Sequence, residues 1–170
     1  MTFAESCDQL SLLVQSLRLK ILIWGPGEAA PDFPKRETIR NKVREHFPNA
    51  EVRYSEDHDL NQLVPGFADV SLQEREHWQL AACDACIVLD TSKGAGEEIA
   101  HFVGSPYSHK LIIFTHEKYQ QVTSFAAALR ENQNQMFYND EEYDSCCALA
   151  QRILGLLMHR GLAKLGGLMV

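Results

Sequence analysis

Short apolar runs alternate along the chain with longer stretches in which apolar residues recur every three or four positions. The runs predict buried strands, and the recurring pattern predicts helices with one apolar face. The predicted strands cover residues 19–24, 51–54, 85–89, 110–115 and 135–138. The predicted helices cover residues 5–17, 35–47, 70–82, 97–103, 119–132 and 143–160. Strands and helices that alternate in this way indicate an α/β protein.

Two of the predicted helices carry local signals of their own. Ile39, Val43 and Phe47 are spaced four apart, which places them on one face of a helix. Ser71 is followed three residues later by Glu74, which is the capping-box pattern that begins a helix. We therefore expect one helix with a buried face before the second strand and one capped helix before the third.

The order of these elements predicts how they are arranged in space. Neighbouring parallel strands need crossover connections, so we expect a five-stranded, mostly parallel sheet between two layers of helices. The expected fold is a flavodoxin-like three-layer sandwich with strand order 2-1-3-4-5, in a single domain over residues 1–170. The polar segment 55–67 is expected to be a long loop. The apolar, glycine-rich tail 161–170 is expected either to cover the core or to contact another subunit.

Composition narrows the class of protein. The formal net charge of −7, from 16 basic and 23 acidic residues, opposes binding to a phosphate backbone, so no nucleic-acid partner is expected. No apolar run is long enough for a membrane span and no signal peptide is recognisable, so we expect a cytoplasmic protein with no membrane partner. Five irregularly spaced cysteines indicate free thiols rather than a disulfide framework.

Ligands of open α/β sheets bind beyond the carboxyl ends of the strands, at the point where the strand order reverses. In the expected order this point lies between the first and third strands, which selects the loops 24–32 and 90–98. Glycines in these loops let the backbone approach a ligand closely, and polar side chains can hold it. The candidate binding residues are Trp24, Gly25, Pro26, Gly27, Asp90, Ser92, Gly94 and Gly96.

Glu98 is the candidate reactive group. It follows a turn predicted over residues 91–96, and it lies in the first turn of a helix predicted to begin at Glu97. The helix dipole favours a carboxylate at this position and keeps it ionised, which suits a nucleophile or a partner for a developing cation. An acidic residue at a helix start is also explained by the stability of the helix alone.

Three further features have a functional and a structural interpretation. Lys35 and Arg36 begin a predicted helix and can meet phosphates, although a solvated helix face is the interpretation that we favour. The Cys83-x-x-Cys86 spacing suits a redox or zinc site, but Cys86 begins a buried strand, so we expect apolar packing and no metal. His101 comes one turn after Glu98 and is the histidine best placed to assist it.

Parts of the chain resemble the nucleoside 2-deoxyribosyltransferases and their relatives. The resemblance rests on Ile-Trp-Gly-Pro at 23–26, on ACDACIVLD at 82–90 and on GAGEEIA at 94–100. TIR-type NAD-cleaving domains share the layout and are more distantly similar. The resemblance implies that Glu98 acts at the anomeric carbon of a nucleoside, and that Glu76, eight residues before Asp84, is a second catalytic acid. Ser92 departs from the family pattern, which has an acidic residue six positions before the catalytic glutamate.

The resemblance therefore implies an enzyme that cleaves or transfers an N-glycosidic bond. Its substrate is expected to be a nucleoside, a nucleotide or NAD, with no cofactor, and the family's habit implies a homo-oligomer. Asp90 or Ser92 can hold ribose hydroxyls, and Trp24 or Trp78 can stack on a base, although packing in the core is the simpler role for either indole. The alternative function is a nucleotide-sensing or signalling module that keeps the fold without turnover.

Overall fold

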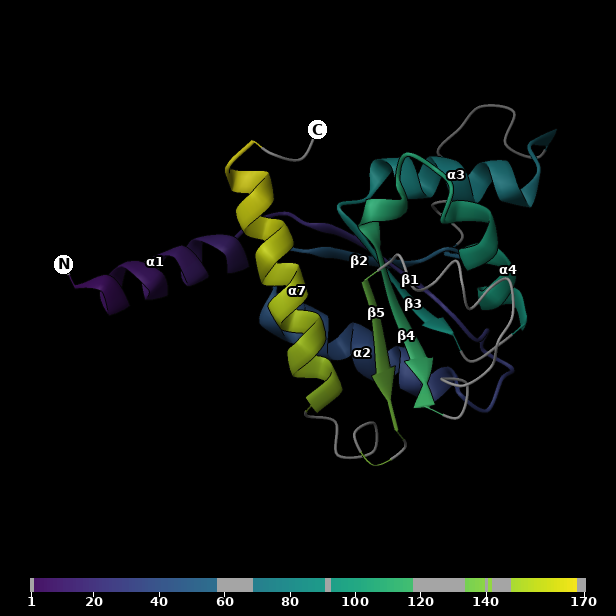
Figure 1. Ribbon diagram of the computed structural model, residues 1–170, viewed down its shortest axis with the longest axis horizontal. Helices are drawn as coiled ribbons and strands as arrows, with labels where there is room; N and C mark the ends of the chain where they lie inside the picture. The colour runs from purple at the N-terminus through teal and green to yellow at the C-terminus, as the bar shows by residue number, and fades with distance from the viewer. Residues whose placement is uncertain are drawn as a thin grey trace.

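The computed structural model of the chain describes residues 2–57, 69–90, 93–117, 134–139, 141 and 148–167. Five strands form one sheet in the order β2-β1-β3-β4-β5, and each neighbouring pair runs parallel (Figure 1). The strands are β1 (Lys20–Trp24), β2 (Glu51–Tyr54), β3 (Ala85–Asp90), β4 (Leu111–His116) and β5 (Asn134–Tyr138). The predicted fold class and strand order are confirmed.

Helices cover both faces of this sheet. The described helices are α1 (Phe3–Gln15), α2 (Phe33–His46), α3 (Leu72–Ala82), α4 (Lys93–Phe102) and α7 (Ala148–Leu165), with a short 3-10 turn at η3 (Ser108–Lys110). One core lies between the sheet and α2, α7 and the last turn of α1. A second core lies between the opposite face and α3 and α4 (Figure 1). The molecule is therefore the expected three-layer sandwich.

Side-chain alternation along the strands assigns each residue to one of the two cores. In β1, Ile21 and Ile23 face the α2/α7 layer, whereas Leu22 and Trp24 face the α3/α4 layer. Every residue of β3 is buried, because helices cover this central strand on both sides.

The two local helix signals are confirmed. The Ser71 hydroxyl accepts a hydrogen bond from the backbone N–H of Glu74, and the Glu74 carboxylate accepts one from the N–H of Ser71, at 3.0 Å. On α2, Ile39 and Val43 are buried against the sheet, and Phe47 closes the same face directly after the helix.

Two predicted boundaries are wrong. The helix that was expected to begin at Glu97 begins at Lys93, so Gly94 and Gly96 lie inside α4 rather than in a turn. The first amide groups of a helix have no intrahelical partner, so glycines that usually break helices are tolerated in its first turn. At the other end of the chain, α7 does not stop at Arg160 but continues to Leu165, so the tail begins as helix.

Position 161 is a glycine inside α7, and α1 packs directly against the helix at this position. A Cβ at this position would overlap the Cγ1 of Val14, which is fully buried near the end of α1. The first residue of the predicted tail thus covers the core. The predicted helix over 119–132, most of the predicted loop 55–67 and residues 168–170 lie outside the described residues.

Polar side chains at the amino ends of the strands have structural partners. Asp84, just before β3, accepts hydrogen bonds from the backbone N–H of Lys20 at 2.8 Å and from Lys164 Nζ at 2.7 Å. Lys110 is buried, and its Nζ donates to the carbonyls of Leu80 and Ala81 at the end of α3. These contacts fasten α3 and α7 to this edge of the sheet.

Cys83 and Cys86 are both buried in the α3/α4 core as free thiols. Burial raises the pKa of Cys83 to about 12. A thiol with this pKa stays protonated and is a poor nucleophile. Among the described residues, no helix is both long enough and apolar enough to cross a lipid bilayer.

We expect Gly161→Ala to destabilise the protein by about 1–3 kcal/mol, because the added methyl group must displace Val14 in a packed contact. Gly155→Ala is the matched control, since nothing lies within 4 Å of a Cβ at that position on the same helix. Alanine is favoured over glycine inside a helix by about 0.5–1 kcal/mol, so the control should stabilise. Urea unfolding of both variants measures the difference, and equal effects would contradict the close packing of α1 on α7.

Candidate functional site

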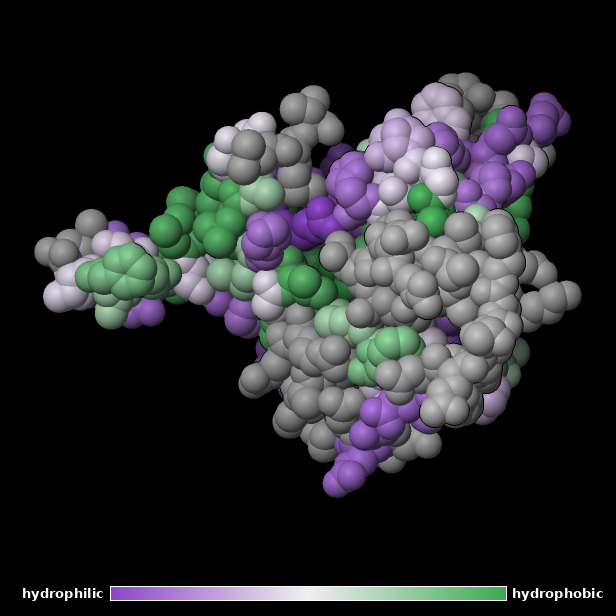
Figure 2. All heavy atoms as spheres, in the orientation of Figure 1, coloured by the Kyte–Doolittle hydropathy of each residue, from purple (hydrophilic) through white to green (hydrophobic). Residues whose placement is uncertain are grey.

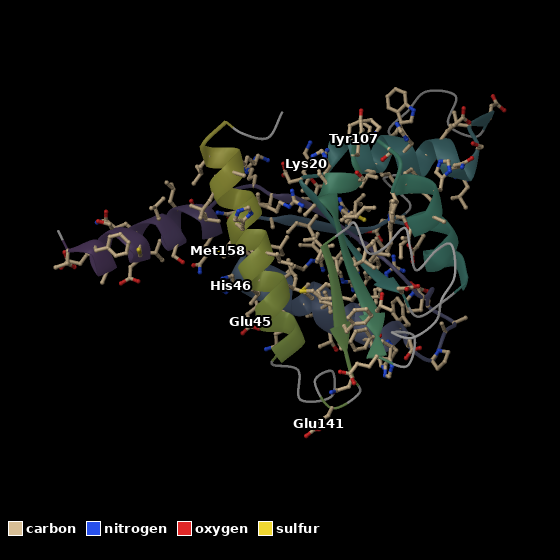
Figure 3. All side chains as sticks on the ribbon, viewed as in Figure 1. Lys20, Glu45, His46, Tyr107, Glu141 and Met158 are labelled. Carbon is tan, nitrogen blue, oxygen red and sulfur yellow. The ribbon has the colours of Figure 1, made fainter. Side chains whose placement is uncertain are left out.

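The carboxyl ends of β1 and β3 lie side by side at the reversal point of the sheet. The two strands pair in parallel, with Trp24 opposite Val88. The chain leaves β1 toward α2 on one face, and it leaves β3 toward α4 on the other. This divergence is the arrangement in which open α/β sheets bind ligands. In Figure 3 this edge lies at the opposite end of the sheet from Lys20, the first residue of β1.

Trp24 ends β1 and is fully buried. Its ring lies 5.1 Å from the ring of Phe102 on α4, centroid to centroid. Its Nε1 is buried without a hydrogen-bond partner among the described residues. Trp24 is therefore a packing residue that forms the wall between the sheet and α4. The second tryptophan, Trp78, is largely exposed on α3.

The loop after β1 approaches β3 closely. A Cβ at Gly25, where φ is +156°, would lie 3.0 Å from the Cβ of Leu89. Glycine is required here because any side chain would press on the neighbouring strand. Pro26 is buried, whereas Gly27 is exposed and open around its Cα. Gly25 and Pro26 are therefore packed against the protein, and Gly27 faces solvent.

Arg36 holds this loop in place from the first turn of α2. Its guanidinium group is 1% exposed and donates to the carbonyl of Ile23 at 2.6 Å and to the carbonyl of Pro26 at 3.2 Å. It also makes a two-pronged ion pair with Glu56, with one contact of 2.8 Å. The ring of Tyr54 lies 4.1 Å beneath it. One side chain therefore joins the ends of β1 and β2 to the loop between β1 and α2.

Both interpretations of Arg36 from the sequence are wrong. It belongs neither to a solvated helix face nor to a phosphate site, because carbonyl groups and Glu56 occupy its donors. Lys35 is partly exposed and pairs with Asp32 at 3.3 Å. A basic residue at a helix start gives no sequence signal of such burial. In the sequence, an acidic residue shortly after the second strand, Glu56, is a hint of an ion-pair partner for Arg36.

Two opposing effects act on the pKa of Glu56. Partial burial raises the pKa, but the hydrogen bonds and the positive charge of Arg36 outweigh burial and hold it below its ordinary value. The carboxylate is therefore ionised at neutral pH and keeps its ion pair with Arg36.

Asp90 ends β3 on the face that leads into the α3/α4 layer. It is only 6% exposed, and its Oδ2 accepts a hydrogen bond of 3.2 Å from the hydroxyl of Thr115. Thr115 stands opposite Asp90 in the register of β3 and β4 and is itself buried. Sequence analysis did not single out Thr115. The sequence feature that could have identified Thr115 is a hydroxyl residue near the end of an otherwise apolar strand.

Glu76 is a second buried carboxyl group, on α3. It is 7% exposed and precedes Leu80 by one turn, on the face that α3 presents to the sheet. The chain of α3 runs back from the carboxyl edge of the sheet toward β3, so its first turns lie at this edge.

Glu98 is the sixth residue of α4, one turn before Phe102, so the prediction that it lies in the first turn of the helix is wrong. Phe102 packs on Trp24, so α4 carries the backbone of Glu98 along the same side of the sheet. Gly96 and Gly94 lie in the same helix, two and four residues before Glu98. The side chain of Glu98 and the whole of Ser92 lie outside the described residues. His101 is exposed and meets Gln73 of α3 at 2.8 Å, so it connects the two helices.

The structure thus gathers part of the predicted set. Trp24 and Asp90 lie on the α3/α4 side of the carboxyl edge, and Glu76 is buried on α3 in the same layer. The loop 25–27 directly follows β1 at the same edge of the sheet. Carboxyl groups in such a layer can hold hydroxyl groups and stabilise a positive charge.

No protein-family model and no curated protein matches the chain. Among solved structures, it is similar to a crystal structure described as a conserved protein from Enterococcus faecalis V583. That match has a TM-score of 0.48 and 14% sequence identity, and it covers 85% of this chain and 99% of the other. The description names no activity.

We expect Arg36→Met to destabilise the protein by about 1–3 kcal/mol, because it leaves the buried carbonyls of Ile23 and Pro26 without a donor. Arg36→Lys should recover part of this loss, since an ammonium group keeps the charge but lacks the fork. Arg40→Met is the control, because Arg40 also stacks on Tyr54, at 4.3 Å, without these carbonyl bonds. Urea unfolding measures all three, and a larger loss in Arg40→Met would refute the central role of Arg36.

The Glu56 ion pair should make stability depend on pH. The pKa of Glu56 is lowered from 4.5 in the folded protein, so its contribution is present above that value and lost as pH falls through the folded pKa. The difference in unfolding free energy between the wild type and Glu56→Gln should therefore shrink between about pH 7 and about pH 3. In an Arg36→Met background, Glu56→Gln should show no such trend. A difference independent of pH in the wild-type background would contradict the ion pair.

Proposed function

We propose that the protein binds a nucleoside, a nucleotide or NAD at the carboxyl edge of β1 and β3 and breaks its N-glycosidic bond, with Glu98 as the reactive carboxylate. The observation that carries this proposal is that Trp24 and Asp90 end the neighbouring strands β1 and β3 at the reversal point of the sheet, with a further buried carboxyl group, Glu76, on α3. The topology supports it, because the strand order reverses between these two strands. The resemblance of residues 82–100 to the deoxyribosyltransferase motif supplies the reaction.

The bond that breaks joins the anomeric carbon to the nitrogen of the base. Its electron pair leaves with the base, and the sugar becomes an oxocarbenium-like cation that water or a second acceptor then captures. A fixed carboxylate favours this cation more in the transition state than in the neutral substrate, which lowers the barrier. When water is the acceptor, its oxygen bonds to the anomeric carbon and one of its protons passes to the base.

The remaining residues have supporting roles in this proposal. Asp90 accepts hydrogen bonds from the sugar hydroxyls, and Thr115 keeps its carboxylate oriented through the 3.2 Å hydrogen bond. Glu76 supplies a second carboxyl group on the same side, suited to passing a proton to the leaving base. Trp24 and Phe102 form the apolar wall that keeps water away from the charged groups.

We expect Glu98→Gln to reduce release of free base by about 10²–10³-fold, because the amide cannot neutralise the developing cation. Glu97→Gln is the matched control, since it makes the same change at the neighbouring position, and successive positions of a helix are about 100° apart around its axis. The assay incubates the protein with a panel of nucleosides, nucleotides and NAD and follows free base by chromatography. The proposal fails if the wild type releases no base from any of them, or if Glu98→Gln releases as much as the wild type.

A nucleotide-sensing module is the second candidate function. The specific observation in its favour is the way Arg36 fastens the loop after β1, which gives a preformed binding edge that needs no turnover. The departure at Ser92 from the family's acidic residue agrees with it. The same panel distinguishes the two functions. A sensor is stabilised against heat by a ligand that chromatography recovers unchanged, whereas the enzyme converts its ligand.

A further inference from the structure

The loop that joins β1 to α2 is polar where it meets solvent. Pro26 is buried, whereas Gly27 is exposed, and a Cβ at Gly27 would have nothing within 4 Å. None of the large exposed apolar side chains of the described residues lies in this loop. Figure 2 shows apolar surface instead where α1 meets α7, at the other edge of the sheet. A ligand that touches the loop would therefore meet its backbone and its polar groups.

Two carbonyl groups of this loop are hydrogen-bonded within the protein. The Pro26 carbonyl accepts a hydrogen bond of 3.2 Å from the buried Arg36. The Gly27 carbonyl accepts one of 2.9 Å from the N–H of Ala30, which closes a turn in the loop. The C=O and N–H groups of a planar trans peptide point in opposite directions. The peptide between Pro26 and Gly27 is trans, so its N–H points away from Arg36.

This N–H, on Gly27, is available as a hydrogen-bond donor. It makes no hydrogen bond to another described residue, and Gly27 is exposed. Hydrogen bonds that follow one another polarise one another, so the guanidinium group at the Pro26 carbonyl strengthens the N–H of the same peptide. The loop therefore presents a polarised donor that an oxygen atom of a ligand can accept.

The contacts of Arg36 fix the direction of this donor. Arg36 is 1% exposed and pairs with Glu56 at 2.8 Å. Taking a charge out of water costs free energy, so a buried ion pair often adds little net stability, and its best-attested use is to specify one arrangement of the chain. Arg36 binds the carbonyl of Ile23 at the end of β1 as well as that of Pro26. The Gly27 N–H is consequently held in a set direction relative to the carboxyl end of β1.

We propose that the Gly27 N–H donates a hydrogen bond to an oxygen atom of the ligand, and that Arg36 is the positioning residue that sets the direction of this bond. The inference rests on the proposed function only for the class of ligand, which is a nucleoside, a nucleotide or NAD. Sugar and phosphate oxygens both accept such a bond. Arg36 itself does not touch the ligand, because the carbonyls and Glu56 occupy its donors.

The test follows binding to the full chain by NMR, with adenosine, adenosine 5′-monophosphate and NAD as probes. The amide signal of Gly27 is the glycine signal that is absent from Gly27→Pro, which has no N–H at this position. We expect this signal to move when a probe binds. Movement with the two phosphate-bearing probes alone assigns the accepting oxygen to a phosphate group, and movement with adenosine as well assigns it to the sugar.

Substitutions separate the donor from its support. Gly27→Pro should weaken binding of the probe at least about tenfold, because it removes the donor, and Gly27→Ala, which keeps the N–H, should bind more tightly than Gly27→Pro. Arg36→Met should also weaken binding, and adding Gly27→Pro to it should cause no further loss, since both changes remove the same bond. Arg40→Met is the control, because Arg40 stacks on Tyr54 without the carbonyl bonds, and it should leave the affinity unchanged.

Circular dichroism shows whether each variant folds, and Arg36→Lys, which keeps the charge without the fork, replaces Arg36→Met if that variant does not. The inference is overturned if no probe moves the Gly27 signal, if Gly27→Pro binds as tightly as the wild type, or if the two losses add in the double variant. The two proposals fail separately. Probes that bind through Gly27 without release of base leave this inference standing and end the proposed enzyme. Release of base with a KM that Gly27→Pro does not change supports the enzyme and overturns this inference.

Discussion

Helices on both faces of the sheet leave almost no room for polar side chains except at the ends of its strands. Every residue of β3 is buried, and the inward positions of β1 and β4 are apolar until their last residues. A polar group in the middle of this sheet would lose its contacts with water and find no partner. Polar chemistry is therefore confined to the two edges, and each edge uses it differently.

At the amino edge, the polar side chains are satisfied by one another and by the backbone. Asp84 is held by Lys164 and by the amide of Lys20, and Lys110 is held by two helix carbonyls. At the carboxyl edge, Arg36 is satisfied in the same way, but it does so by fixing the loop that follows β1. Asp90 is a buried carboxyl group at the same edge, where its Oδ2 accepts a hydrogen bond from Thr115, and Glu76 is a second buried carboxyl group on α3. The carboxyl edge, rather than the amino edge, is the candidate site because the strand order reverses there between β1 and β3.

The sequence predicts the framework well because two periodicities dominate it. Runs such as 85–89, apolar at every position, and the spacing of Ile39, Val43 and Phe47 leave little choice of element or face. It fails where a contact distant in sequence decides the outcome. Gly94 and Gly96 resemble a turn, and only the structure shows that α4 includes them. Gly161 resembles a helix end, because nothing near it in sequence reveals that Val14 fills the space of its missing side chain. Arg36 resembles a surface residue for the same reason, since its carbonyl partners belong to the preceding strand and loop.

α1 and the candidate site lie at opposite edges of the sheet. α1 runs into the amino end of β1, and the end of α7 that supports it is fastened there through Lys164 and Asp84. At the carboxyl edge, Arg36 fixes the loop after β1, and Thr115 donates to Asp90. These two sets of contacts share no residue, so substitutions at one edge should change stability independently of those at the other.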